Sequence, residues 1–179
     1  MKPEMIDATY LLLESIRDSF AGDDFWFSYL TGLLDDRRHS RAIHLGIFSP
    51  PYIEFLLRGA KTVESRFSSV RCAPFYCVKP GDIVLVKRSS GPIVALFCAG
   101  EVWSYRLTSR TWKTIRERFE EAISPTSKDF WRENESATYA TLIQVEHVRQ
   151  LKPIPWNKSD RRGWVVLQRR RDMNLTLFE

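Results

Sequence analysis

Cysteine and histidine are both scarce in this chain of 179 residues, which has only three of each. The cysteines, Cys72, Cys77 and Cys98, form no paired framework, and a sparse, odd count is typical of a reducing, cytoplasmic environment. A structural zinc site needs four closely spaced ligands, whereas the histidines are scattered and no second cysteine pair exists. We therefore expect no metal site and no cofactor.

Long apolar runs and the motifs of several large enzyme classes are absent as well. No apolar run approaches the roughly 20 residues that span a bilayer, and the acidic residues near the N-terminus do not fit a secretory signal. These features predict a cytoplasmic protein without membrane association. The sequence also has no glycine-rich phosphate loop, nucleophile elbow or internal repeat.

The composition supports a folded protein with a mild basic excess. Hydrophobic residues make up 44% of the chain and aromatic residues 13%, which is enough for a core. Lys and Arg number 27 against 22 acidic residues, a net charge of +5. Residues 1–42 hold five basic and eight acidic residues (−3), whereas residues 150–179 hold seven and three (+4). The basic character outside the N-terminal segment favours an anionic partner.

The N-terminal segment is predicted to be helical. Apolar residues at three- and four-residue spacing predict a helix over 4–20, and Asp23 or Asp24 can cap a second helix rich in aromatic residues. We expect those aromatic side chains to be covered, either by the barrel or by a second copy of the protein. The predicted organisation is a helical extension at 1–41, an α+β domain at 42–168 and a basic tail at 169–179.

The rest of the chain alternates between strand and helix patterns. Strands are predicted at 42–48, 61–67, 83–86, 93–103, 139–145 and 164–167. Helices are predicted at 49–59, from Thr108 or Ser109 to Ile123, and at 128–134. Gly100 suggests a bulge in the long strand, and two prolines in 151–156 predict an extended connection outside the sheet. A histidine inside a strand, His44, is more typical of a wall residue than of a ligand.

The stretch from Gly59 to Arg66 carries the densest pattern of polar residues. If it is a strand, Thr62, Glu64 and Arg66 share one face, and Val63 and its alternate neighbours share the other. A hydroxyl, a carboxylate and a guanidinium in a row can read a polar ring such as a nucleobase. The alternative interpretation is a solvated edge strand.

The run PPYIEFLLRGAKTVESR resembles the opening signature of the ASCH domains, which are PUA-like small β-barrels. The pattern is an aromatic residue in a short helix, followed by G-x-K-T-x-E-x-R on a strand. The Pro-Gly-Asp turn before the strand at 83–86 adds to the resemblance, which covers about residues 42–150. It implies an α+β fold, in which helices flank a small mixed β-barrel, and RNA or nucleotide binding, with amidohydrolase or nuclease activity in some members.

Nucleotide binding is the first functional hypothesis. The expected partner is RNA, another single-stranded nucleic acid or a free nucleoside, with an aromatic side chain stacked on the base. The predicted nucleotide-binding residues are Tyr52, Lys61, Thr62, Glu64, Arg66 and Tyr76.

A hydrolase and a protein-interaction module are the alternatives. One ASCH subgroup removes acetyl from N4-acetylcytidine with a Lys, a Thr and a Glu; Lys61 matches the Lys, but the Thr position falls on Glu64. Without the threonine nucleophile, Glu64 would have to activate water instead. The resemblance places the late acid at Glu120 or Glu121 by spacing only. A metal-free ribonuclease would use Lys61 and Arg66 to stabilise the phosphorane charge. The interaction module would use the aromatic N-terminal helices as its partner surface.

Overall fold

The computed structural model describes residues 3–36, 40–127, 129–157 and 161–170. Their contacts divide into two units, one running up to Ile43 and resuming at Val166, the other spanning His44–Val165. Among the described residues, none of the helices has the length and apolar character to cross a membrane.

The first unit contains the two predicted N-terminal helices. They are α1 (Pro3–Ser19) and α2 (Asp24–Asp35), which pack against each other. The Asp23 carboxylate accepts a hydrogen bond from the backbone N–H of Trp26 at 3.0 Å, so the predicted cap is present. The Trp26 side chain is fully buried, as expected of an aromatic residue in this segment. Of the basic tail, residues 171–179 lie outside the described residues.

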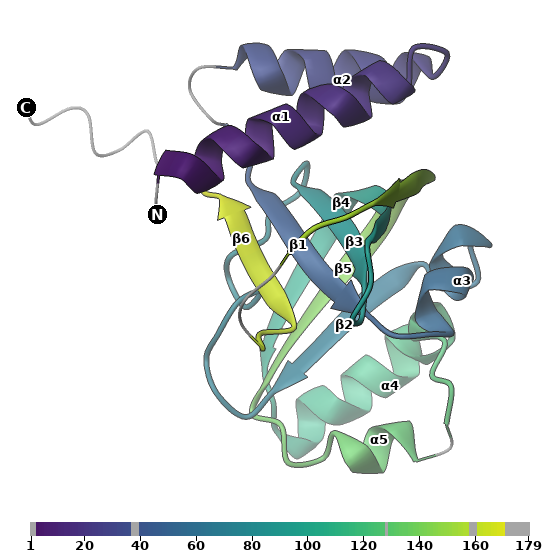
Figure 1. Cartoon of the computed structure of the whole chain (residues 1–179). Helices are drawn as coiled ribbons and strands as arrows, with labels where there is room; N and C mark the ends of the chain where they lie inside the picture. The colour runs from purple at the N-terminus through teal and green to yellow at the C-terminus, as the bar shows by residue number, and fades with distance from the viewer. Residues whose placement is uncertain (1–2, 37–39, 128, 158–160, 171–179) are drawn as a thin grey trace, which may run out of the picture. The chain divides into compact units, whose positions relative to one another are not determined.

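The six strands form one sheet that curls into a half-barrel (Figure 1). They are β1 (Ile43–Phe48), β2 (Val63–Ser68), β3 (Ile83–Arg88), β4 (Ile93–Arg106), β5 (Tyr139–Ile154) and β6 (Trp164–Gln168). Their order across the sheet is β2-β5-β4-β3-β1-β6, with antiparallel pairing of β2 with β5, β5 with β4 and β4 with β3. The predicted α+β fold with a barrel-like sheet is confirmed, and its strands β2 and β6 are sheet edges.

Strand β5 is longer than the sequence predicts. The segment 151–156 was expected to leave the sheet because of its prolines, yet β5 continues to Ile154, which pairs with Ile93. The pairing of β2 with β5 ends at Gln144. Beyond that point β5 has an open side, where Pro153 need not donate a ladder hydrogen bond.

Gly100 sits at an irregularity in β4, as predicted. The register with β5 shifts between Ala99 and Val102. A Cβ atom on Gly100 would lie 2.6 Å from Oε1 of Glu146, so the Glu146 side chain would have to move to admit a larger residue.

The second unit has three helices within its described residues, of which α4 packs against β2 and α3 against β5. They are α3 (Tyr52–Leu57), α4 (Ser109–Ile123) and α5 (Phe130–Glu133), and Thr108 caps α4 as predicted. Val63 on β2 packs with Ile115 and Phe119 of α4 in one core cluster. This contact fixes the alternation of β2, so that Glu64 and Arg66 face away from α4.

Candidate functional site

The Arg66 side chain bridges segments from opposite edges of the curled sheet. Its Nε donates to Oε1 of Glu64 at 2.6 Å. Its Nη2 donates to the Ile47 carbonyl at 2.9 Å, and its Nη1 donates to the Gly163 carbonyl, just before β6, at 3.2 Å. Arg66 lies on β2, so these bonds connect the first and last strands in the sheet order. We infer that the guanidinium helps to hold the half-barrel closed.

Glu64 connects this arginine to a buried lysine. Lys61 and Glu64 are 2% and 4% exposed, and Lys61 Nζ lies 3.4 Å from Oε2 of Glu64. Lys61 also donates to the Ile123 carbonyl, at the last residue of α4, at 2.9 Å. A buried charge is stable only when it is paired and hydrogen-bonded, and both conditions are met here.

Burial lowers the pKa of Lys61 from its ordinary value of 10.5, because the charged ammonium loses its hydration. The neighbouring carboxylate of Glu64 acts in the opposite direction and favours the protonated form, and the charge of Arg66 adds a smaller lowering effect. A lysine with a lowered pKa beside a cavity is a recognised sign of a functional site.

A cavity of about 220 Å³ opens beside this lysine. Its lining combines three aromatic rings, two small hydroxyls and the three charged groups. The residues are Ile47, Phe48, Ser49, Tyr52, Lys61, Glu64, Ser65, Arg66 and Phe130. We call it the Lys61 cavity. The Lys61 ammonium lies 5.2 Å from the ring centroid of Tyr52, whose hydroxyl is 3.1 Å from Thr126 Oγ1.

Four predicted site residues lie outside this cavity. Thr62 precedes β2 and is exposed, because its backbone bonds to Ala122 and Val145 direct its side chain outward. Tyr76 is 66% exposed on a loop and does not line the cavity. On α4, Glu120 accepts a hydrogen bond from Trp131, and Glu121 is exposed. Neither glutamate lines the Lys61 cavity, and α4 contributes the Ile123 carbonyl to Lys61 instead.

Sequence patterns missed several residues that shape the site. Phe48 ends β1, Ser49 follows it and Phe130 begins α5, so the chain brings them to Lys61 only through the fold. Gly163 contributes a backbone carbonyl, which carries no residue signal at all. One available clue was the position of Ser49, which immediately precedes the family-like run.

A separate buried polar cluster around His44 supports the wall of the site. The indole Nε1 of Trp164 donates to Nδ1 of His44 at 3.2 Å, so Nε2 of His44 carries the proton that faces Oδ2 of Asp82, also at 3.2 Å. The Arg66 guanidinium lies 5.1 Å from the Trp164 ring and 4.7 Å from the Phe48 ring. His44 is a satisfied wall residue, as the sequence predicted.

No group of three or more potential metal ligands occurs within the part of the chain that the structure describes. The Lys61 cavity itself presents an amine, a carboxylate, a guanidinium, hydroxyls and aromatic rings.

Comparison with solved structures identifies the fold. The chain matches no protein-family model and no curated protein. It is similar to the crystal structure of ASCH from Zymomonas mobilis, with a TM-score of 0.57 and 14% sequence identity, covering 70% of this chain and 87% of that one. The chain has the fold of an ASCH domain.

Two variants of the same Zymomonas mobilis protein give the same result. A Tyr-to-Phe mutant of ZmASCH matches with a TM-score of 0.57, 15% identity and coverage of 72% and 91%. A Ser-to-Ala mutant matches with a TM-score of 0.57, 14% identity and coverage of 72% and 90%. The resemblance noted in the sequence is thus confirmed at the level of the ASCH fold.

Proposed function

We propose that this ASCH-type domain binds single-stranded RNA or a modified nucleotide by taking one base into the Lys61 cavity. The observation that carries this proposal is a buried Lys61–Glu64 pair that lines a cavity beside an aromatic ring. At about 220 Å³ the cavity is smaller than the roughly 300–1,000 Å³ typical of drug-sized ligands. One small planar ring is an occupant of suitable size.

The pair retains hydrogen-bonding capacity for a base edge. A protonated lysine has three donors, and the Ile123 carbonyl and Glu64 account for two of those on Lys61. A carboxylate offers about four lone-pair sites, of which Glu64 uses two for Lys61 and Arg66. The remaining donor and acceptors are adjacent, and nucleobase edges present adjacent donors and acceptors as well.

The surroundings suit an anionic ligand with an unstacked base. Tyr52 is half-buried and can stack on a base, an interaction worth about 1–3 kcal/mol by truncation. Exposed arginines in the same unit, Arg58, Arg71 and Arg161, provide positive charge for phosphates. A base can enter the cavity when it is unpaired and unstacked, as it can be in single-stranded nucleic acid.

The experiment is a salt series of affinity for single-stranded RNA, measured by fluorescence anisotropy. Wild type should bind with an affinity that falls as salt rises, because phosphate contacts release counterions. Lys61→Met keeps the buried stem and removes the charge, so it should weaken binding about tenfold or more. The matched control is Lys113→Met, since Lys113 is 77% exposed on α4. No binding at low salt would overturn the proposal and favour a partner surface on α1 and α2.

A hydrolase is the second candidate, and the lowered pKa of Lys61 favours it. In its neutral form Lys61 can accept a proton from water as the water oxygen attacks an amide carbonyl, and then pass that proton to the leaving nitrogen. Glu64 stands where the resembled amidohydrolases have a threonine, so a water nucleophile replaces a hydroxyl nucleophile in this scheme.

The hydrolase candidate is tested separately from binding. The protein is incubated with N4-acetylcytidine and with RNA, and acetate and RNA fragments are measured for wild type and for Lys61→Ala. Activity that Lys61→Ala abolishes would support catalysis at this cavity. Activity that is equal in both proteins would remove Lys61 from the mechanism.

A further inference from the structure

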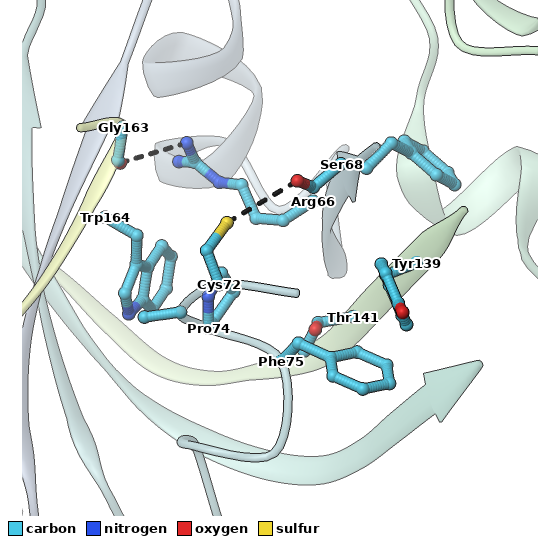
Figure 2. Close-up of a pocket in the computed structure, with 11 residues that line it drawn as sticks. Arg66, Ser68, Cys72, Pro74, Phe75, Tyr139, Thr141, Gly163 and Trp164 are labelled. Carbon is cyan, nitrogen blue, oxygen red and sulfur yellow. Dashed lines mark hydrogen bonds between the residues drawn. The ribbon is translucent and has the colours of Figure 1, made fainter. Parts of the chain in front are cut away.

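A second cavity of about 180 Å³ adjoins the Lys61 cavity, and Arg66 lines both. The further lining residues come from β2, β5, the loop after β2 and the start of β6. They are Phe67, Ser68, Cys72, Ala73, Pro74, Phe75, Tyr139, Thr141, Gly163 and Trp164. We call it the Tyr139 cavity. Figure 2 shows Phe75 and Tyr139 together on one side of it and Trp164 on the other.

The strand register makes the two cavities parts of one polar track. Arg66 pairs with Thr141, and Ser68 pairs with Tyr139. Directly opposed residues of neighbouring strands point to the same face of a sheet. The face of β2 that carries Glu64 in the first cavity therefore continues through Arg66 to Ser68 in the second.

The Tyr139 cavity offers aromatic rings that a second base can contact. The Phe75 and Tyr139 rings lie 4.9 Å apart at 60°, an edge-to-face arrangement that fixes both rings. Tyr139 is half-buried, so part of its side chain remains accessible. At the rim, Ser68 Oγ donates to the Val70 carbonyl at 2.7 Å and lies 3.4 Å from the exposed thiol of Cys72.

Arg66 has donors left for an anion between the cavities. A guanidinium has five N–H donors, and three of those on Arg66 are used by Glu64, Ile47 and Gly163. Two N–H donors remain, one on each terminal nitrogen. The side chain is 21% exposed, so a ligand can reach it. Arginine is well suited to a phosphate because its donors are planar and paired.

The geometry points to a second nucleotide subsite in the Tyr139 cavity, with the connecting phosphodiester at Arg66. This inference rests on the proposed function, and it makes the ligand a strand of at least two nucleotides. One base occupies the Lys61 cavity, and its neighbour contacts the Phe75 and Tyr139 rings. A free nucleoside fills only half of the site.

The first test compares mononucleotides with dinucleotides by calorimetry. The probes are the common ribonucleoside monophosphates and the complete set of ribodinucleotides. The best dinucleotide should bind about tenfold or more tightly than the best mononucleotide, the size of one added stacking contact. Tyr139→Leu should remove that gain. Tyr76→Leu should retain the gain, because Tyr76 is exposed on the loop that carries Phe75 and lies outside the cavity.

The second test does not depend on the folding of a cavity variant. Cys72 is exposed, Cys77 is half-buried and Cys98 is buried, so in a Cys77→Ser background a maleimide should label Cys72. A bulky maleimide on Cys72 should abolish the higher affinity of the dinucleotide over the mononucleotide and leave mononucleotide affinity unchanged. The Cys72→Ser, Cys77→Ser protein, treated in the same way, should keep the gain.

The outcomes separate this inference from the proposed function. If mononucleotides bind and dinucleotides bind no more tightly, the second subsite is wrong and the Lys61 cavity stands. If the label weakens both ligands equally, the two cavities are not separate subsites and the inference fails. If neither ligand class binds to wild type, the proposed function itself is wrong.

Discussion

The molecule contains two buried polar clusters that differ in what they face. In the first, His44 lies between Asp82 and Trp164, and both nitrogens of its ring have partners. In the second, Lys61 and Glu64 are almost as deeply buried, but they line an open cavity and keep unused hydrogen-bonding capacity. Burial of polar groups is therefore common to structural and functional clusters. The second cluster differs because its hydrogen-bonding capacity is partly unused and lies next to a cavity.

The largest expected effect comes from breaking the second cluster at Arg66. Arg66→Met leaves Glu64 with one charged partner and the Ile47 carbonyl without its donor. Removal of one partner from a buried pair costs about 3–5 kcal/mol, so the free energy of unfolding should fall by that amount in urea titrations.

An exposed ion pair between an arginine and an aspartate provides the control for that variant. Arg132 lies 3.0 Å from Asp129, and both side chains are largely exposed. Arg132→Met should therefore change the free energy of unfolding by less than about 1 kcal/mol. Equal losses for the two arginine variants would contradict a closing role for Arg66.

A smaller loss is expected when the first cluster is broken. Asp82→Ala leaves His44 Nε2 and the backbone N–H of Lys79 without their acceptor. An unsatisfied buried group costs about 1–3 kcal/mol, which urea unfolding would detect. RNA affinity of the folded variant should be unchanged, because Asp82 lines neither cavity. A loss of affinity with unchanged stability would reverse the roles assigned to the clusters.

Truncation of the aromatic ring should affect binding rather than folding. Tyr52→Leu removes the ring beside Lys61 and should weaken RNA affinity by about 1–3 kcal/mol, as measured by anisotropy. The free energy of unfolding should change much less, because Tyr52 is only half-buried. Undiminished affinity would exclude Tyr52 as the stacking residue.

The smallest expected effect is a pH dependence of stability that arises from Lys61. The pKa of Lys61 is lowered in the folded protein, so the unfolded chain holds this proton at pH values where the folded protein has released it. Stability relative to Lys61→Met should therefore rise with pH from the lowered pKa up to about 10.5. Parallel stability curves for the two proteins would show that the lysine is not perturbed.

Local signals allowed most of the secondary structure to be predicted. Asp23 and Thr108 cap helices because their side chains bond to backbone groups three residues ahead, which is a property of the local sequence. Gly100 marked the irregularity in β4 for an equally local reason. The continuation of β5 to Ile154 was not predictable, because it depends on pairing with Ile93 and on the open side of β5 beyond β2.

The candidate site was predictable only where its residues are neighbours in the chain. Glu64 and Arg66 lie on β2 and Lys61 lies just before it, so the alternation of side chains placed Glu64 and Arg66 on one face. Gly163 meets Arg66 across 97 residues through its backbone carbonyl, and no residue pattern announces such a contact. Tyr76 does not line the cavity, because an aromatic residue on a nearby loop need not face it.

The Lys61 cavity lies next to a tryptophan, and this gives the protein a built-in optical reporter. Phe130 lines the cavity, and its ring lies 5.1 Å from that of Trp131, whose indole donates to Glu120 on α4. A ligand that contacts Phe130 would change the environment of the Trp131 indole. Titration of unlabelled protein, followed through its own tryptophan emission, should therefore register occupancy of the cavity.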